Sequence, residues 1–258
     1  MRRIKTFFVL LFVWFIVCAG QGGAEDKTIS LATLEWEPYI GPSMTNNGYV
    51  HEIVVEALKR VGYKADIKYY PWARAVKLSE EGKCDGLFPE YYDEGRKPKY
   101  VFSDPYPGGP VGFYKQKKAN IKFSVDPQKK QTEALKALQQ YKFGVVRGYI
   151  NTQEFDSADF LKKEEVVSDE QNLVKLFKGR IDLIFIDKYV AKHIIVKKYP
   201  HYMDELEFLE PPLEIKPLYI AFSTKAPDYE KKRSVFNEGL KLLEKDGAMK
   251  AILEKHGF

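Results

Sequence analysis

The alternation of short apolar strands with amphipathic helices, which occurs in both halves of the chain, constrains the fold most. Residues 50–61 carry apolar side chains at i, i+3, i+4, i+7, i+8 and i+11, and Gly62 ends that helix. Residues 65–70 alternate as a strand does, and Pro71 suits the first turn of the next helix. The first half therefore predicts strands at 28–34, 65–70 and 83–88, with helices at 50–61 and 71–82 between them.

The second half repeats this order. Strands are predicted at 141–146, 164–168 and 180–187, and helices at 150–160 and 169–179. A Gly-x-x-Asp pattern ends a helix and opens a strand at Gly82–Asp85, and the same pattern recurs at Gly179–Asp182. Two βαβαβ series of similar design predict an α/β protein of two lobes, each with a largely parallel sheet.

Two extended stretches, 108–118 and 214–225, are expected to connect the lobes. The last two amphipathic helices, at about 227–244 and 246–255, are expected to return to the first lobe. Two strands then cross between the lobes and form a hinge above a cleft, which is a common site for small ligands. The predicted boundaries are 25–112 plus 221–258 for lobe 1 and 113–220 for lobe 2.

We interpret residues 1–24 as a secretory signal peptide. Three basic residues precede an apolar run that is too short for a membrane span, and small residues at 22–24 offer a cleavage site. Export to the periplasm is the expected consequence, and the remaining chain of about 234 residues has the length of two small lobes. A lipid anchor at Cys18 is the alternative, although the residues before it match poorly the small residues that such cleavage prefers.

Charge and cysteine content exclude several classes of protein. Without the first 24 residues the net charge falls from +5 to about +2, and the lysines are interleaved with acids, unlike the basic patch of a nucleic-acid-binding protein. Cys84 is then the only cysteine, so no intramolecular disulfide forms. The four histidines are scattered without metal-ligand spacing, and neither a nucleophile motif nor a phosphate-binding loop is present, so we expect no metal and no cofactor.

Six motifs in order resemble the extracellular solute-binding proteins of family 3, the periplasmic amino-acid-binding proteins of ABC importers. The motifs are GYVHEIVVEALKRVG, PWARAVKLSEEGKCDGLF, EGRKPKYVFSDPY, KFGVVRG, LFKGRIDLIFID and FNEGLKLLEKDGAMKAILEKHG. The resemblance implies the type II periplasmic-binding-protein fold and a monomeric receptor that closes its lobes over an amino acid or similar small solute. Its partner is then a membrane permease, and the receptor itself is no enzyme.

The resemblance also implies roles for individual residues. Arg96 matches the arginine that forks onto the ligand α-carboxylate, and Asp187 matches the aspartate that takes the α-ammonium. Asp187 can also cap the helix that follows it, and both roles can coexist. Gly148 matches the glycine before a helix whose amides face the carboxylate. Trp36 matches the aromatic residue that covers the ligand, and Trp72 matches an apolar residue at the start of the facing helix.

Two segments depart from the family pattern. Pro89–Tyr92 stands where the family has small hydroxyl residues, and Tyr149 replaces a threonine. An aromatic-lined cleft with a carboxylate suits a solute that carries positive charge or an extended flat surface. The further residues that we expect to line the cleft are Tyr39, Arg74, Glu90, Tyr91 and Tyr149.

Two alternatives use the same scaffold. A few exported proteins similar to this family are cyclohexadienyl dehydratases, and Glu90 among aromatic residues is then the candidate general acid, with a raised pKa. A ligand-sensing or cell-wall-lyase protein is the other alternative, but the solute-binding unit occupies the whole of the remaining chain.

Overall fold

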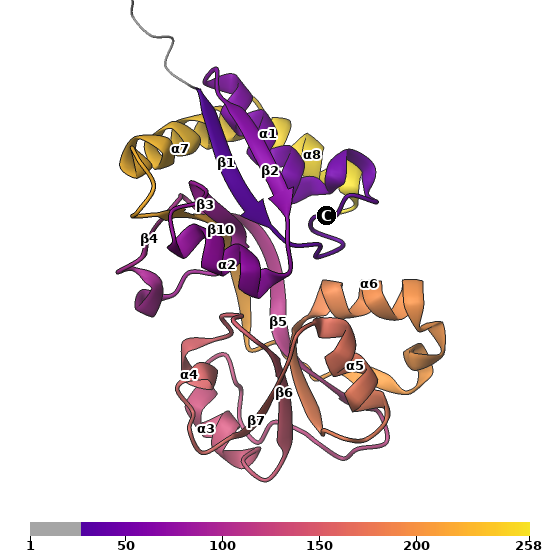
Figure 1. Cartoon of the computed structure of the whole chain (residues 1–258). Coiled ribbons are helices and arrows are strands. Elements are labelled where there is room, and N and C mark those ends of the chain that lie inside the picture. Colours follow the sequence, from indigo (N-terminus) through magenta and orange to yellow (C-terminus); the bar gives the residue numbers. More distant parts are fainter. Residues whose placement is uncertain (1–26) are drawn as a thin grey trace, which may run out of the picture.

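The computed structural model describes residues 27–258, so the predicted signal peptide and Cys18 lie outside the described residues. Two groups of helices and strands lie one above the other and are joined by the strands β5 and β10 (Figure 1). We name the upper group lobe 1 and the lower group lobe 2. No helix within residues 27–258 is both long enough and apolar enough to cross a membrane.

Lobe 1 is built on three parallel strands. Its elements are β1 (Thr28–Thr33), α1 (Tyr49–Arg60), β2 (Lys64–Tyr69), α2 (Trp72–Glu80), β3 (Gly86–Glu90), β4 (Tyr100–Phe102), and the 3-10 turns η1 (Thr45–Asn47) and η2 (Glu94–Arg96). Strand β1 lies between β2 and β3, with Thr28 opposite Lys64 and Leu31 opposite Gly86. Helix α1 is amphipathic as predicted, and its Val50, Ile53 and Val54 are fully buried.

Lobe 2 repeats this arrangement. Its elements are α3 (Gln131–Ala137), β6 (Lys142–Val146), α4 (Gln153–Asp156), β7 (Lys162–Val166), α5 (Asp169–Phe177), β8 (Leu183–Asp187), α6 (Lys188–Lys198), the 3-10 turn η3 (Pro200–Asp204) and β9 (Leu206–Phe208). Strand β6 lies between β7 and β8, parallel to both. The predicted α/β class with two lobes and two crossing strands is therefore confirmed.

The two Gly-x-x-Asp patterns have the same structural role. Asp85 precedes β3 and accepts a 2.8 Å hydrogen bond from the backbone N of Ser30 in β1. Asp182 precedes β8 and accepts a 2.8 Å hydrogen bond from the backbone N of Lys142 in β6. In each lobe this aspartate ties the third strand to the central one, which explains why the pattern repeats.

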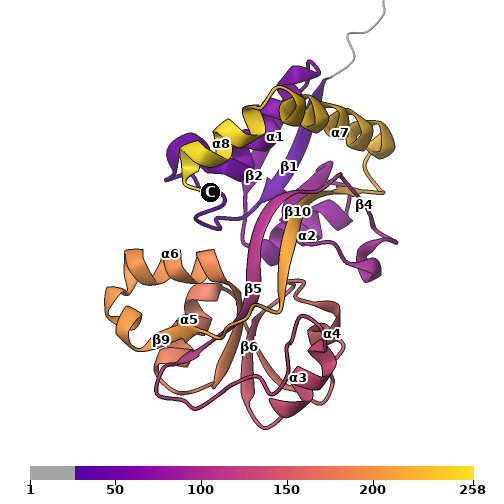
Figure 2. The same cartoon turned by 180° about the vertical axis from the view of Figure 1, so that it is seen from behind.

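Strands β5 (Tyr106–Gln116) and β10 (Glu214–Ser223) join the lobes (Figure 2). They pair antiparallel with each other, with Glu214 opposite Val111 and Leu218 opposite Tyr106. Strand β10 also pairs with β3 and β5 with β8, so the strand order is β2-β1-β3-β10-β5-β8-β6-β7. The register of β10 against β5 shifts at Pro217, which has no N–H to give to the ladder.

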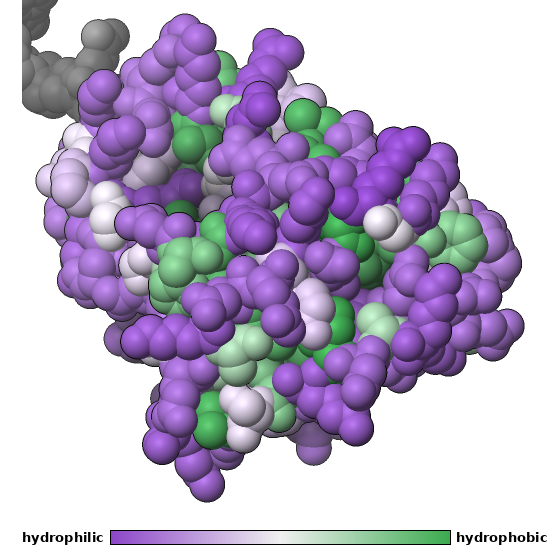
Figure 3. Space-filling model, turned by 90° about the horizontal axis from the view of Figure 1, so that it is seen from below, coloured by the Kyte–Doolittle hydropathy of each residue, from purple (hydrophilic) through white to green (hydrophobic). Residues whose placement is uncertain are grey.

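The C-terminal helices return to lobe 1, as predicted. Helix α7 (Tyr229–Lys245) packs against α1 so closely that a Cβ on Gly239 would collide with the backbone of Ala57. Helix α8 (Ala248–His256) follows along the same side of the lobe (Figure 2). Mostly hydrophilic residues, with separate hydrophobic areas, form the face of the molecule that is seen from below (Figure 3).

Some local predictions were wrong. The predicted helix at 150–160 shrinks to the four residues of α4, and Asp156 accepts hydrogen bonds from the backbone N and the side chain of Asn151, which lies outside the helix. The third strand of lobe 1 begins at Gly86, later than predicted, since Cys84 and Asp85 still belong to the turn after α2. Helix α3 and the short strands β4 and β9 were not predicted.

Candidate functional site

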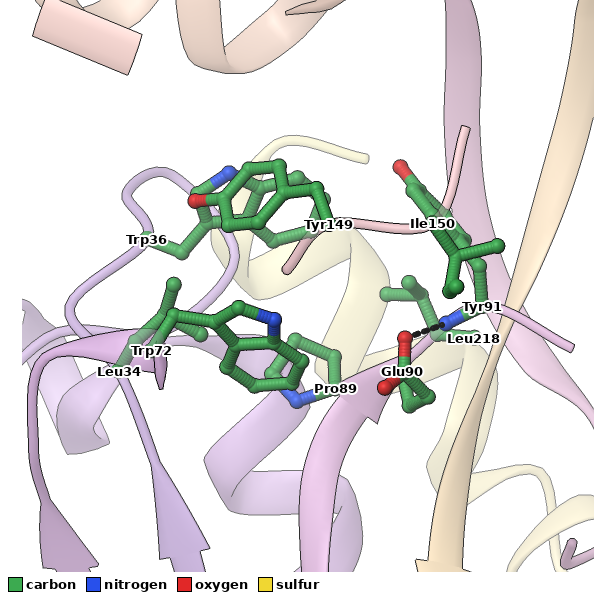
Figure 4. Close-up of a pocket in the computed structure, with 9 residues that line it drawn as sticks. All are labelled: Leu34, Trp36, Trp72, Pro89, Glu90, Tyr91, Tyr149, Ile150 and Leu218. Atoms are coloured by element: carbon green, nitrogen blue, oxygen red, sulfur yellow. Dashed lines mark hydrogen bonds between the residues drawn. The ribbon is translucent and has the colours of Figure 1, made fainter. Parts of the chain in front are cut away.

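Apart from Arg74, the predicted site residues meet between the lobes, where the elements of both lobes end. Trp36, Trp72, Glu90 and Tyr91 from lobe 1 and Tyr149 from lobe 2 line an inner cavity of about 30 Å³ (Figure 4). An outer cleft of about 510 Å³ lies next to it. The two spaces share Leu34, Trp36, Trp72 and Tyr149 as walls.

Arg96 is engaged within the protein on both sides of its guanidinium. Its Nη2 donates a 2.7 Å hydrogen bond to the Gly148 carbonyl oxygen, and its Nη1 lies 2.7 Å from Glu90 Oε2. The side chain of Arg96 is 13% exposed and that of Glu90 is 3% exposed. The Nη1–Oε2 contact is badly aligned, so neither atom has a hydrogen-bond partner within the described residues.

Burial controls the protonation of Glu90. Desolvation raises its pKa to about 7, although Arg96 and the Tyr91 amide, which donates a 2.9 Å hydrogen bond to Oε1, act in the opposite direction. Figure 4 shows Glu90 at the inner end of the cavity with this hydrogen bond. A solute carboxylate that approaches Arg96 therefore has to compete with a carboxyl group already beside it.

Gly148 acts as an acceptor between the lobes. Its carbonyl oxygen accepts a 2.9 Å hydrogen bond from Trp72 Nε1 in addition to the one from Arg96. Gly148 has φ of 78°, in the left-handed region that favours glycine. No helix follows it directly, because α4 begins only at Gln153, so the implied helix N-terminus is absent at this position.

Asp187 serves two partners inside the protein. Its Oδ1 accepts hydrogen bonds from the backbone N of Tyr189 at 2.8 Å and of Val190 at 3.1 Å, and so caps α6. Its Oδ2 accepts a 2.7 Å hydrogen bond from the hydroxyl of Tyr39 of lobe 1, and neither residue lines the inner cavity or the outer cleft. Burial raises the pKa of Asp187 to about 7. A Cβ on Gly109 of β5 would collide with the Tyr39 hydroxyl, so this glycine is required for close approach.

Asp169 is a cleft residue that we did not predict from the sequence. It is the first residue of α5 and is 6% exposed. Its Oδ2 accepts 3.2 Å hydrogen bonds from Trp36 Nε1 of lobe 1 and from the Tyr149 hydroxyl of lobe 2. Burial raises its pKa to about 6. The sequence predicted only that a helix begins at this position.

Lys216 of β10 was also missed. Its Nζ donates a 2.6 Å hydrogen bond to the Asn151 carbonyl oxygen and lies 4.9 Å from the centre of the Tyr91 ring. Burial lowers the pKa of Lys216. The hydroxyl of Tyr91 is buried and has no hydrogen-bond partner among the described residues. A lysine in a connecting strand gave no sequence signal for a place in the site.

Arg74 lies apart from the other predicted residues. Its side chain is exposed, its guanidinium lies 5.1 Å from the centre of the Tyr70 ring, and it lines neither cavity. Position 74 follows Trp72 by two residues on α2, and residues two apart on a helix point in different directions. Among residues 27–258, no group of three or more His, Cys, Asp and Glu side chains is arranged to hold a metal ion.

Several solved structures are similar to this chain. An ancestral arginine-binding protein bound to arginine is 21% identical, with a TM-score of 0.72, over 90% of this chain and 99% of that one. A histidine kinase sensor domain with similarity to periplasmic binding proteins is 18% identical, with a TM-score of 0.73, over 89% and 96%. The substrate-binding protein of an amino acid ABC transporter is 18% identical, with a TM-score of 0.70, over 89% and 99%.

These similarities show the type II periplasmic-binding-protein fold, as the resemblance implied. No curated protein matches the chain in sequence. The family of bacterial extracellular solute-binding proteins, family 3, matches residues 32–258. That match covers nearly all of the described residues. The chain belongs to the bacterial extracellular solute-binding proteins of family 3.

Proposed function

We propose that the protein is the periplasmic receptor of an ABC-type importer and that it closes its two lobes over an amino acid or a related small solute. The observation that carries the proposal is the inner cavity, whose walls come from both lobes, and beside it Trp36, Trp72 and Arg96 of lobe 1 donate hydrogen bonds to Asp169 and Gly148 of lobe 2. Family membership and the similarity to amino-acid-binding proteins support it. A monomer that delivers its solute to a membrane permease fits this role.

The size of the inner cavity suggests how the solute enters. Its volume of about 30 Å³ is far smaller than the roughly 300 Å³ or more of ligand pockets in general. The lobes must therefore separate before a solute fits into the inner cavity. Trp72, Arg96 and Trp36 then exchange their partners in lobe 2 for groups of the solute, which gives the solute different affinities for the open and the closed form.

The solute contacts that we propose use the predicted residues. Where such a residue already has a partner within the protein, the solute has to replace that partner. Arg96 is the carboxylate contact, provided that the carboxylate displaces Gly148 O and outcompetes Glu90. Trp36, Trp72, Tyr91 and Tyr149 form the apolar walls. We retain residues 25–112 plus 221–258 and 113–220 as the proposed extents of the two lobes.

One observation favours a second candidate, an enzyme such as a dehydratase. Glu90 is buried among aromatic side chains, and its pKa of about 7 suits a general acid. Against this, its neighbour Arg96 is close enough to hold it in place as an ion pair. We propose that the protein catalyses no reaction. Conversion of prephenate or arogenate by the purified protein, lost in Glu90→Gln, would contradict this proposal.

A thermal-shift screen tests the receptor role, because a solute that binds the native state raises the unfolding midpoint. The panel comprises amino acids, polyamines, sugars and small organic acids. We expect at least one solute to raise the midpoint, and small-angle X-ray scattering to show a smaller radius of gyration with that solute than without it. No shift with any solute of the panel would count against a solute receptor.

A further inference from the structure

We propose that Asp169 binds the cationic group of the solute, and that this group is an ammonium or guanidinium group with N–H donors. The inference rests on the proposed receptor function and names the class of its solute. It assigns the cation contact to a residue at the start of α5, whereas the resemblance implied Asp187 at the end of β8.

Asp169 has an unused oxygen. Both of its hydrogen bonds, from Trp36 and from Tyr149, reach Oδ2, while no residue of the described range 27–258 donates to Oδ1. No Lys, Arg or His of that range forms an ion pair with it either. A buried carboxylate without a cation is costly, and its free Oδ1 is an acceptor that a cation from outside the protein can use.

Asp169 stands in the first turn of α5, where the helix N-terminus favours a negative charge, but it does not cap the helix. Ser168, one residue earlier, caps α5 through a 3.3 Å hydrogen bond from the Gln171 backbone N to its Oγ. Asp187 differs, since it caps α6 with Oδ1 and accepts from Tyr39 with Oδ2. Of the two aspartates, Asp169 is the one with an oxygen that accepts no hydrogen bond from the described residues, and it is also the one that lines the outer cleft.

The surroundings of Asp169 suit an organic cation. It lines the outer cleft of about 510 Å³ beside Trp36, Trp72 and Tyr149. Trp72 and Tyr149 meet edge to face, with ring centres 6.1 Å apart. Aromatic faces beside a carboxylate attract cations through their quadrupole as well as by charge. Because these aromatic walls also border the inner cavity, a solute body can extend from Asp169 toward Glu90 once the lobes separate.

The charges that line the outer cleft favour a cation. Glu37 is paired with His193 at 2.9 Å, and Glu170 is paired with Lys198 at 2.6 Å. Among the described residues of this cleft, Glu35 and Asp169 are carboxylates without an ion-pair partner, and Lys197 is the lysine without one. Lys197 is exposed, whereas Asp169 is buried, so the cation-binding position is Asp169.

The test begins with defined probes. Thermal shifts are measured with L-arginine, L-lysine, agmatine and putrescine, and with L-citrulline, L-glutamate and L-alanine for comparison. The best cationic probe is then titrated by calorimetry into wild type, Asp169→Asn and Asp159→Asn. Asparagine keeps an acceptor for Trp36 and Tyr149 and removes the charge, and Asp159 is an exposed acid of lobe 2 that lines neither cavity.

We expect the cationic probes to raise the midpoint. Asp169→Asn should weaken the best of them about tenfold or more, as loss of a charged hydrogen bond does, and Asp159→Asn should change the dissociation constant less than about twofold. On wild type, the bis-trimethylammonium analogue of putrescine keeps the charge and lacks N–H donors, and we expect it to bind about tenfold more weakly than putrescine. This arm does not depend on the folding of any variant.

Three outcomes overturn the inference. They are an unchanged affinity of the best cation for Asp169→Asn, equal binding of the quaternary analogue, and binding of glutamate or alanine without binding of any cationic probe. In the last case the receptor function still stands, because a solute has bound. Failure of every solute, including the wider panel of the thermal-shift screen, removes the receptor function together with the inference.

Discussion

Arg96 and Gly148, which approach each other from opposite lobes, are joined by a 2.7 Å hydrogen bond from Nη2 to the carbonyl oxygen. The resemblance assigned both residues to the same ligand carboxylate. In the closed arrangement they satisfy each other, and Glu90 takes the remaining side of the guanidinium. The binding free energy that a solute carboxylate obtains at Arg96 is therefore only the difference between its own contacts and those that it replaces.

Removing Arg96 should destabilise the protein itself. Arg96→Ala leaves Glu90 buried without its cation, and we expect a loss of about 3 kcal/mol in the free energy of unfolding, the lower end for breaking a buried ion pair. The lower end applies because Glu90 can take up a proton. Urea unfolding at pH 7 measures the loss, and Arg96→Ala combined with Glu90→Gln should recover most of it. If the double variant recovered none of the lost unfolding free energy, Arg96 and Glu90 would not be coupled energetically.

Glu90→Gln alone should change solute preference. It keeps the shape of the side chain and removes the charge that competes for Arg96, so solutes with a carboxylate should bind more tightly by about 1 kcal/mol, or about fivefold. Calorimetry with the solute identified in the screen provides the measurement. A fall in affinity instead would assign Glu90 to the solute as a charge partner.

Asp187 can be tested by two substitutions with different effects. Asparagine is as good a helix cap as aspartate, so Asp187→Asn should change the free energy of unfolding by less than about 1 kcal/mol. Asp187→Ala loses the cap of α6 and leaves the buried Tyr39 hydroxyl unpaired, which together should cost about 2 to 4 kcal/mol. Tenfold weaker binding of the solute by the well-folded Asp187→Asn would restore Asp187 as the ammonium contact.

Trp72→Phe should favour the open form without a change in the fold. The variant keeps an aromatic wall and loses the 2.9 Å hydrogen bond to Gly148 O, which contributes about 1 kcal/mol to closure. We expect a larger radius of gyration for the protein without solute and, because the solute no longer has to displace this bond, an affinity up to about fivefold tighter. An unchanged scattering curve and an unchanged affinity together would show that this bond does not control closure.

The pH dependence of stability should reveal the buried carboxyl groups. Burial raises the pKa of Asp169 to about 6, above its value in the unfolded chain. The neutral carboxyl group therefore contributes to the free energy of unfolding at pH 4, and this contribution is lost as the pH rises through 6. Relative to wild type, Asp169→Asn should gain up to about 3 kcal/mol in unfolding free energy between pH 4 and 8. Urea unfolding at both pH values measures this gain, and Asp159→Asn serves as the control. If the difference in unfolding free energy between Asp169→Asn and wild type were the same at both pH values, it would contradict the raised pKa of Asp169.

The fold was largely predictable because its signals are local and repeated. The apolar stripe of α1 and the duplicated Gly-x-x-Asp pattern each act within a few residues, and the structure contains both. The segment after Gly148 was mispredicted because a side-chain bond from Asp156 competes with helix formation there. Helix periodicity carries no information about such a competitor.

The site was harder to predict, because its contacts join residues that are far apart in sequence. Asp169 becomes a cleft residue only through Trp36, 133 positions earlier in the chain. Lys216 enters the site only because β10 carries it past Tyr91. Sequence motifs indicated which residues stand at the ends of elements, but the pairing of those ends depends on how the two lobes face each other.

The mutual pairing of β5 and β10 limits how the lobes can move. Because the two strands hydrogen-bond to each other and continue into the sheets of both lobes, bending one bends the other. Two independent linkers would permit twisting and sliding, whereas this ribbon leaves essentially one axis of rotation. Opening is then described by a single angle. If the proposed permease touches one point on each lobe, the distance between the two points would differ between the open and the closed form.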